Sequence, residues 1–260
     1  MANINAEDTA SLSDAFKDIE TVIHLASNPD IARAALEPRI DFIQGTSLTE
    51  SVLEASRMAK VKRILYASGS GVYKANGLDP ISEDSRLQAI STYGASKLAG
   101  EALLSSYNFM FGIKTIAFRF ANVVGPKQTH GVGYDFMRKL KSNQESLTVL
   151  GDGSQTKSYI NVSDVVNAVL LAESKISSEF EAFNVSTLDY ISVAEIAELA
   201  ILVSGLNRDE IKIEFGSSDR GWKADVPKIF LDSTKIRSLG WESKMTSREA
   251  IYSSLVSMTR

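Results

Sequence analysis

A tyrosine and a lysine four residues apart form the pattern with the clearest chemical meaning, Tyr93-Gly-Ala-Ser-Lys97. On a helix, residues four apart share one face, so the Lys97 ammonium could stabilise a Tyr93 phenolate. A tyrosine with an unperturbed pKa near 10 is mostly protonated at neutral pH, and it can act as a general base only beside a positive charge. Average residue usage gives roughly half a chance match to this spacing in a chain this long, so the pair needs support from its surroundings.

The elements around this pair predict an α/β fold. Short apolar runs alternate with amphipathic stretches, which is typical of parallel strands joined by helices. A Ser/Gly turn over residues 68–71 links one predicted strand to the segment that leads to Tyr93. The predicted strands are Thr21–Leu25, Arg63–Ala67 and Lys114–Phe120, and the predicted helices are Thr46–Ala59, Ser91–Met110 and Asp164–Ser174. Further strands are expected at Leu147–Leu150 and Lys157–Ile160, around the turn Gly151-Asp-Gly-Ser154, and capping boxes at Ser192/Glu195 and Thr246/Glu249 predict two later helix starts.

Taken in order, these stretches resemble the extended short-chain dehydrogenase/reductase superfamily and, within it, the archaeal branch of the UDP-glucose 4-epimerase family. The matching stretches are Val22-Ile-His-Leu-Ala26, Ser91-Thr-Tyr-Gly-Ala-Ser-Lys-Leu-Ala-Gly-Glu101, Arg119-Phe-Ala-Asn-Val-Val-Gly-Pro126, Thr129-His-Gly-Val132, Gly151-Asp-Gly153, Lys157-Ser-Tyr-Ile160 with Asp164, and Asp219-Arg-Gly-Trp-Lys-Ala-Asp-Val-Pro227. The resemblance therefore runs from about Ala10 to the end of the chain. It implies an NAD-dependent nucleotide-sugar epimerase that acts through a 4-keto sugar.

The resemblance also implies roles for individual residues. Tyr93 would be the base, and Lys97 would bind the nicotinamide ribose and lower the pKa of Tyr93. Leu25 and Ala26 would border the NAD. The residues implied to bind the UDP-hexose are Asn122, Lys157, Tyr159, Arg220 and Asp225.

Each substrate residue also has a plainer interpretation. Asn122 could be an ordinary loop residue, and Arg220 and Asp225 could form a surface ion pair. The ring of Tyr159 could serve only for packing. These alternatives stay open on the sequence alone.

The sequence departs from the superfamily at the phosphate-binding loop. None of its 16 glycines forms the spacing Gly-x-x-Gly-x-x-Gly, whose glycines let backbone amides approach the NAD diphosphate. Relative to the family, the chain is expected to begin at about the third strand. Without its neighbours, the Thr21–Leu25 strand would become an exposed apolar edge of the sheet.

A second departure concerns the catalytic hydroxyl. The position where the family has serine or threonine falls on Gly69, with Ser68 and Ser70 on either side. Neighbours in an extended segment point to opposite faces, so neither serine replaces the missing hydroxyl without a shift of the loop. Ser68 and Ser70 remain candidates on that condition. Phe42 stands where the family commonly has a cofactor-contacting asparagine.

These observations predict an incomplete Rossmann-like, doubly wound parallel sheet followed by a smaller mixed α/β region. We expect a partial NAD-binding domain over residues 1–125 and a nucleotide-sugar-binding region over residues 126–260. Two functions are consistent with this reading. One is an NAD-dependent nucleotide-sugar epimerase, and the other is a non-catalytic relative or subunit that binds a nucleotide sugar but has lost NAD binding.

Composition excludes several other classes. The chain has no cysteine and two histidines, which argues against disulfides and against His- or Cys-based metal sites. A net charge of −4 without a Lys/Arg cluster argues against a nucleic-acid partner. Neither a signal peptide nor a membrane span is expected from the apolar runs, and a cytoplasmic location is predicted. A homodimer through the Ser91 helix and the helix near Val52 is an expectation from the superfamily.

Overall fold

The computed structural model describes residues 5–28, 31–74, 79–177, 179–221 and 226–259. Its chain forms two compact units. The first consists of Met1–Lys74, Glu83–Phe120 and Val169–Asn184, and the second of Ala75–Ser82, Ala121–Ala168 and Val185–Arg260. Both units are assembled from separate stretches of the chain, and the proposed division of function at residue 125 stays a prediction. No helix within the described ranges is long and apolar enough to cross a membrane.

The first unit is built on a four-stranded sheet with the order β1-β2-β3-β8. Its strands are β1 (Thr21–His24), β2 (Arg63–Gly69), β3 (Lys114–Phe120) and β8 (Phe180–Val185). β1 pairs with β2, and β2 with β3, in parallel. Parallel neighbours joined through helices are the predicted α/β arrangement, which is confirmed.

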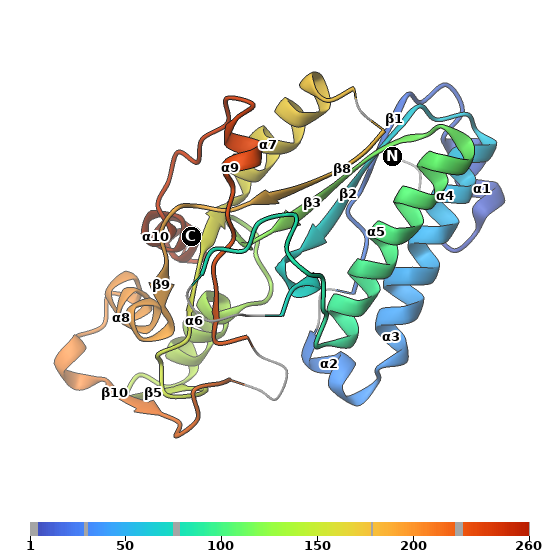
Figure 1. Cartoon of the computed structure of the whole chain (residues 1–260). Coiled ribbons are helices and arrows are strands. Elements are labelled where there is room, and N and C mark those ends of the chain that lie inside the picture. Colours follow the sequence, from blue (N-terminus) through green and yellow to red (C-terminus); the bar gives the residue numbers. More distant parts are fainter. Residues whose placement is uncertain (1–4, 29–30, 75–78, 178, 222–225, 260) are drawn as a thin grey trace. The chain divides into compact units, whose positions relative to one another are not determined.

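Helices pack against this sheet through an apolar core. In chain order they are α1 (Thr9–Ala15), α2 (Ile31–Leu36), α3 (Arg39–Asp41), the π-helical turn η1 (Phe42–Ser47), α4 (Leu48–Met58), the short 3₁₀ turn η2 (Ser70–Val72) and α5 (Thr92–Phe111). α4 and α5 lie side by side, and α5 contacts both β2 and β3 (Figure 1). Leu53 of α4, Leu104 of α5 and Ile64 of β2 are buried in one cluster. Burial of such side chains supplies most of the driving force that fixes these helices on the sheet.

Strand β1 lies at the end of the sheet order, as the sequence predicted. The exposure of its side chains alternates along the strand. Val22 and His24 are buried, whereas Ile23 is 48% exposed and Leu25, which follows the strand, is 66% exposed. The alternation follows from the pleat of the strand, because successive side chains point to opposite faces of the sheet. Within the described residues, only one of these faces is covered at β1.

The second unit contains three small sheets and the remaining helices. Its elements are β4 (Asn122–Val124), α6 (Val132–Ser142), β5 (Ser146–Val149), β6 (Thr156–Lys157), β7 (Tyr159–Asn161), β9 (Ile191–Ser192), α8 (Val193–Ser204), η3 (Arg208–Glu210), β10 (Lys212–Phe215), β11 (Lys228–Ile229), α9 (Thr234–Arg237) and α10 (Ser247–Ser257), and α7 (Val162–Lys175) belongs in part to each unit. Capping boxes open α8 at Ser192 and α10 at Thr246, as predicted. The strand expected at Lys157–Ile160 is divided into β6 and β7, and β5, β6 and β7 belong to three different sheets. β5 pairs with β10 in parallel, and β6 pairs with β9 and β11.

Candidate functional site

Tyr93 and Lys97 lie in the first two turns of α5. The helix begins there because the Ser91 hydroxyl accepts a hydrogen bond from the backbone N–H of Gly94 at 3.0 Å. Lys97 is buried, its Nζ donates to the carbonyl oxygen of Ala67 at 2.7 Å, and the same atom lies 5.6 Å from the centroid of the Tyr93 ring. Helix α5 thus holds the pair beside the carboxyl end of β2, where ligands of parallel sheets bind.

Burial changes the pKa of both groups. Burial, and to a smaller extent the nearby Asp41 carboxylate, raises the pKa of Tyr93 to about 12. Burial also lowers the pKa of Lys97 to about 8. At neutral pH Tyr93 is therefore protonated and Lys97 still carries a charge, so deprotonation of Tyr93 requires a further positive charge near its ring.

The missing side chain at Gly69 faces the Tyr93 hydroxyl. A Cβ atom built on Gly69 would lie 4.0 Å from Tyr93 Oη and 3.9 Å from the carbonyl oxygen of Phe120. The backbone of Gly69 is extended, with φ −163° and ψ 168°, which any residue adopts. The position where the sequence predicts a missing hydroxyl thus points at the Tyr93 hydroxyl, and nothing in its surroundings demands glycine.

A second glycine sets how closely α5 approaches this turn. A Cβ atom on Gly94 would come within 2.1 Å of the carbonyl oxygen of Gly71, a backbone atom of η2. Glycine at position 94 therefore lets the start of α5, with Tyr93, pack directly on the turn that follows β2.

Ser68 and Ser70 occupy different environments. Ser68 is buried, and its hydroxyl donates to Glu101 Oε1 at 2.5 Å, on the side expected from strand alternation. Ser70 is partly exposed at the start of η2. The Glu101 carboxylate also accepts from Arg119, whose Nη2 lies 2.7 Å from Glu101 Oε2. Ser68 thus belongs to a buried polar network, and a catalytic role for either serine stays a prediction.

Sequence reasoning missed a buried carboxylate next to this site. Asp41 is almost fully buried, and its two oxygens accept hydrogen bonds from Asn28 Nδ2 at 2.8 Å and from Thr92 Oγ1 at 2.7 Å. The second bond joins α3 to the residue before Tyr93. Asp41 precedes Thr92 by 51 residues, so no local pattern could have revealed the contact.

The predicted cofactor residues lie at the carboxyl end of β1. Leu25 and Ala26 follow the strand and are exposed, and Phe42 is 59% exposed. The Ser27 hydroxyl is buried without a hydrogen-bond partner among the described residues. An orphaned hydroxyl here, together with buried Lys97, fits the polar groups of the nicotinamide half of a dinucleotide. For the diphosphate half, the sequence contains no Gly-x-x-Gly-x-x-Gly spacing.

The predicted substrate residues belong to the second unit. Asn122 begins β4, which pairs with β7, and its Nδ2 donates to the carbonyl oxygen of Ser158 at 3.2 Å. Tyr159 of β7 is buried in the apolar core of this unit, which agrees with its packing interpretation. Lys157 lies in β6.

Arg220 and Asp225 come from the same stretch of sequence. Arg220 is exposed, and its Nε lies 3.8 Å from Asp219 Oδ1, a weak surface ion pair. Asp225 lies outside the described residues. The binding roles of all five substrate residues stay predictions.

Comparison with known proteins agrees with this arrangement. The model of the NAD dependent epimerase/dehydratase family matches residues 1–186. A UDP-glucose 4-epimerase of Mycolicibacterium smegmatis is 31% identical over 256 residues, which cover 96% of this chain and 79% of that protein. Among solved structures, a UDP-galactose 4-epimerase has a TM-score of 0.86 at 35% identity, covering 98% of this chain and 81% of that one. MoeE5 in complex with UDP-glucuronic acid and NAD has a TM-score of 0.86 at 29% identity, covering 97% and 84%. The chain belongs to the NAD dependent epimerase/dehydratase family.

Proposed function

We propose that this chain carries the site of a UDP-sugar 4-epimerase that uses NAD. The observation that supports this most directly is the placement of Tyr93, Lys97 and the Gly69 position. A side chain at position 69 would point toward the Tyr93 hydroxyl, and the Lys97 ammonium lies near the Tyr93 ring at the carboxyl end of β2. The relatives support the same substrate class, because they are named as UDP-sugar 4-epimerases and a neighbour was solved with both a UDP-sugar and NAD.

In this proposal Tyr93 Oη, as the phenolate, takes the proton of the sugar 4-hydroxyl and later returns it. The positive charge that its deprotonation requires besides Lys97 would come from the oxidised nicotinamide. NAD, when bound, supplies a reversible hydride acceptor, so that the sugar passes through a 4-keto form. Lys97 holds its charge beside the Tyr93 ring and, by position, contributes a donor toward a ribose. Asn122, Lys157, Tyr159, Arg220 and Asp225 are the proposed contacts to the UDP-hexose.

The test is the interconversion of UDP-glucose and UDP-galactose by the purified chain with added NAD. Tyr93→Phe removes one oxygen atom and leaves the ring, so we expect its rate to fall by about a hundredfold or more while its melting temperature hardly changes. Tyr134→Phe, a change of the same size in α6, is the control and should keep the rate. Equal rates for wild type and Tyr93→Phe would refute the assignment of the base.

The second candidate is a nucleotide-sugar-binding relative without catalysis. Gly69, which provides no hydroxyl, is the observation that favours it. Calorimetry separates the two functions. Stoichiometric NAD binding by the 260-residue chain supports the epimerase, whereas UDP binding without NAD binding supports the non-catalytic relative.

A further inference from the structure

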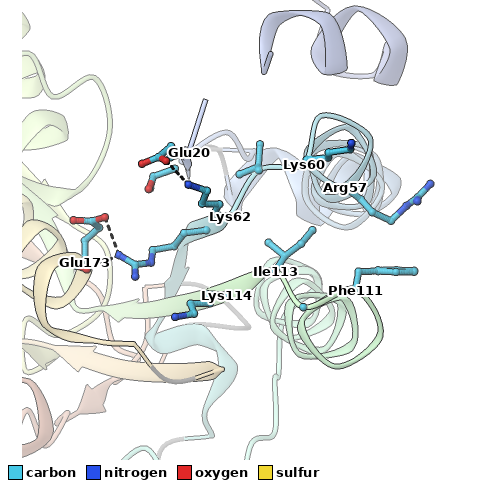
Figure 2. Close-up of a pocket in the computed structure, with 12 residues that line it drawn as sticks. Glu20, Arg57, Lys60, Lys62, Phe111, Ile113, Lys114 and Glu173 are labelled. Atoms are coloured by element: carbon cyan, nitrogen blue, oxygen red, sulfur yellow. Dashed lines mark hydrogen bonds and ion pairs between the residues drawn. The ribbon is translucent and has the colours of Figure 1, made fainter. Parts of the chain in front are cut away.

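A cavity of about 570 Å³ lies at the opposite end of the sheet from Tyr93, within the first unit. The close-up in Figure 2 shows side chains from the amino ends of β1, β2 and β3 around it. The turn from α4 to β2 and the turn from α5 to β3 form its walls, and Glu173 of α7 lines it as well. The predicted catalytic and cofactor residues follow the carboxyl ends of the strands, so this cavity is a separate place on the molecule.

The lining of the cavity is strongly basic, although the whole chain has a net charge of −4. Five lining side chains are basic and two are acidic. The two carboxylates are used by neighbours, because Glu20 pairs with Lys62 and Glu173 pairs with Arg63 at 2.8 Å.

Of the three remaining basic side chains, one is paired with a carboxylate and two are not, among the described residues. Arg57 pairs with Glu54 of its own helix. Lys60 and Lys114 form no ion pair with any residue in the described part of the chain, and Lys114 is half-buried. A half-buried ammonium without a carboxylate partner favours the binding of an anion from solution.

Lys60 also adopts a conformation that glycine would adopt more easily. Its φ is +60°, in the left-handed region, at the end of α4. The equivalent residue at the end of α5, Gly112, has φ +70° and lines the same cavity. Lys60 therefore brings its charge to the cavity from a backbone conformation in which a side chain is less favourable than glycine.

An aromatic ring lies at the side of the cavity away from Lys114. Figure 2 shows Arg57 and Phe111 on one side of Ile113, and Lys62 and Lys114 on the other. Phe111 is 43% exposed, and the Arg57 guanidinium lies 5.3 Å from the centroid of its ring. The cavity therefore offers cations for an oxyanion and, at a distance from Lys114, a partly exposed aromatic ring that also contacts Arg57 and Tyr107.

We propose that this cavity binds the phosphate groups of a small phosphorylated molecule. Lys60 and Lys114 supply the charge that their surroundings leave unused, and Phe111 can stack on a ring attached to the phosphates. The ligand is free pyrophosphate or a nucleoside diphosphate, which share the same anionic group. The proposal is independent of the epimerase function, since it uses none of the residues of that site.

The experiment is hydrogen exchange and calorimetry with inorganic pyrophosphate on the full chain. We expect slower exchange in residues 59–63 and 111–114 and binding that weakens with added salt. Protection elsewhere, with none in these two turns, would overturn the proposal. So would the absence of any binding at millimolar pyrophosphate.

Two variants and a matched control assign the effect to single charges. Lys114→Gln should weaken pyrophosphate binding about tenfold. Lys60→Gly should weaken it about threefold while the melting temperature stays or rises, because glycine accepts the left-handed backbone. Lys141→Gln, an exposed lysine of α6, removes the same charge outside the cavity and should leave the affinity unchanged. Equal weakening by all three variants would refute a site at this place.

ADP distinguishes the two ligand sources. If Phe111→Ala weakens protection of the two turns by ADP and leaves protection by pyrophosphate intact, the nucleotide is the ligand. If it changes neither, the cavity recognises the phosphates alone. Both results support the phosphate site, whereas failure of ADP and pyrophosphate to protect the turns contradicts it.

Discussion

Gly69 is the residue at which the sequence predicts that this chain lacks a hydroxyl of its family. Its Cβ direction points at the Tyr93 hydroxyl, and its backbone is unstrained for a larger residue. A serine at this position would therefore place a hydroxyl beside Tyr93 Oη. Near Gly69 the structure places Tyr93 and Lys97, which the sequence predicted, and Asp41, which it did not.

Gly69→Ser tests this directly. We expect an increase of about tenfold or more in UDP-hexose interconversion in the presence of NAD, because a hydroxyl beside Tyr93 Oη can donate to the developing oxyanion. The assay is the one used for Tyr93→Phe. Gly69→Ala adds the same Cβ without a donor and should leave the rate at the wild-type level. The prediction fails if serine and alanine have equal effects.

Lys97 predicts a dependence of stability on pH. Its folded pKa of about 8 lies below the usual value of 10.5, so between these pH values the unfolded chain binds more protons than the folded one. The free energy of unfolding of the wild type should then gain a contribution as pH rises from 8 to 10.5. Lys97→Met lacks this contribution. Urea denaturation at pH 7.5 and pH 10 measures the free energy of unfolding of the wild type minus that of Lys97→Met. We expect this value to be more positive at pH 10, and the same value at both pH values would contradict the buried-ammonium account.

At the scale of elements, the site depends on how closely α5 packs on the turn after β2. The contact passes through Gly94 and the carbonyl oxygen of Gly71, with no side chain between them. The Thr92–Asp41 hydrogen bond fastens the same helix start to α3. Tyr93 therefore owes its position to a backbone contact at Gly94 and to a side-chain hydrogen bond at Thr92.

Gly94→Ala should destabilise the protein by about 1–3 kcal/mol, because its Cβ would meet a backbone oxygen that cannot move aside. Chemical denaturation measures the change. Gly133→Ala is the matched control in α6, where the nearest atom to an added Cβ is the flexible Leu255 side chain at 3.3 Å. We expect that variant to stay within about 1 kcal/mol of wild type. Similar losses in both variants would show that the close approach at Gly94 is not the cause.

On the scale of the whole molecule, the open edge of the sheet at β1 is the feature that we expect to promote aggregation. Ile23 is 48% exposed on a strand that pairs on one side only among the described residues. Such an edge is a template for pairing with another chain. Ile23→Lys should reduce aggregation on heating, measured by light scattering, and change the melting temperature little. Val22→Lys places the same charge on the buried face and should instead unfold the protein. Unchanged scattering in Ile23→Lys would show that aggregation starts elsewhere.

The homodimer expected from the superfamily is a prediction about the same unit. α4 and α5 carry apolar side chains that remain uncovered within the described chain, such as Met58 at 50% and Met110 at 65% exposure. We expect sedimentation to show a dimer and Met110→Glu to give a monomer, because the new charge would be buried in the interface. A monodisperse monomer of the wild type would contradict this expectation.

Local signals in the sequence were sufficient for much of this protein. The short apolar runs and the helical spacing predicted β1 to β3, α4 and α5 within a few residues, since these patterns follow from which side chains must be buried. The capping boxes at Ser192 and Thr246 were readable because both partners lie three residues apart. The Tyr93/Lys97 pair was recognisable for the same reason, because the two residues lie about one helical turn apart in the sequence.

Only the tertiary structure decided the features that depend on residues distant in the chain. The Asp41–Thr92 bond, the Ser68–Glu101–Arg119 network and the pairing of β5 with β10 join segments whose separation no local pattern encodes. The basic cavity likewise unites two turns and a helix. The sequence determined which groups could do chemistry, and packing determined which of them lie together. The reason is that a shifted pKa, a close approach and an unpaired charge all depend on neighbours in space.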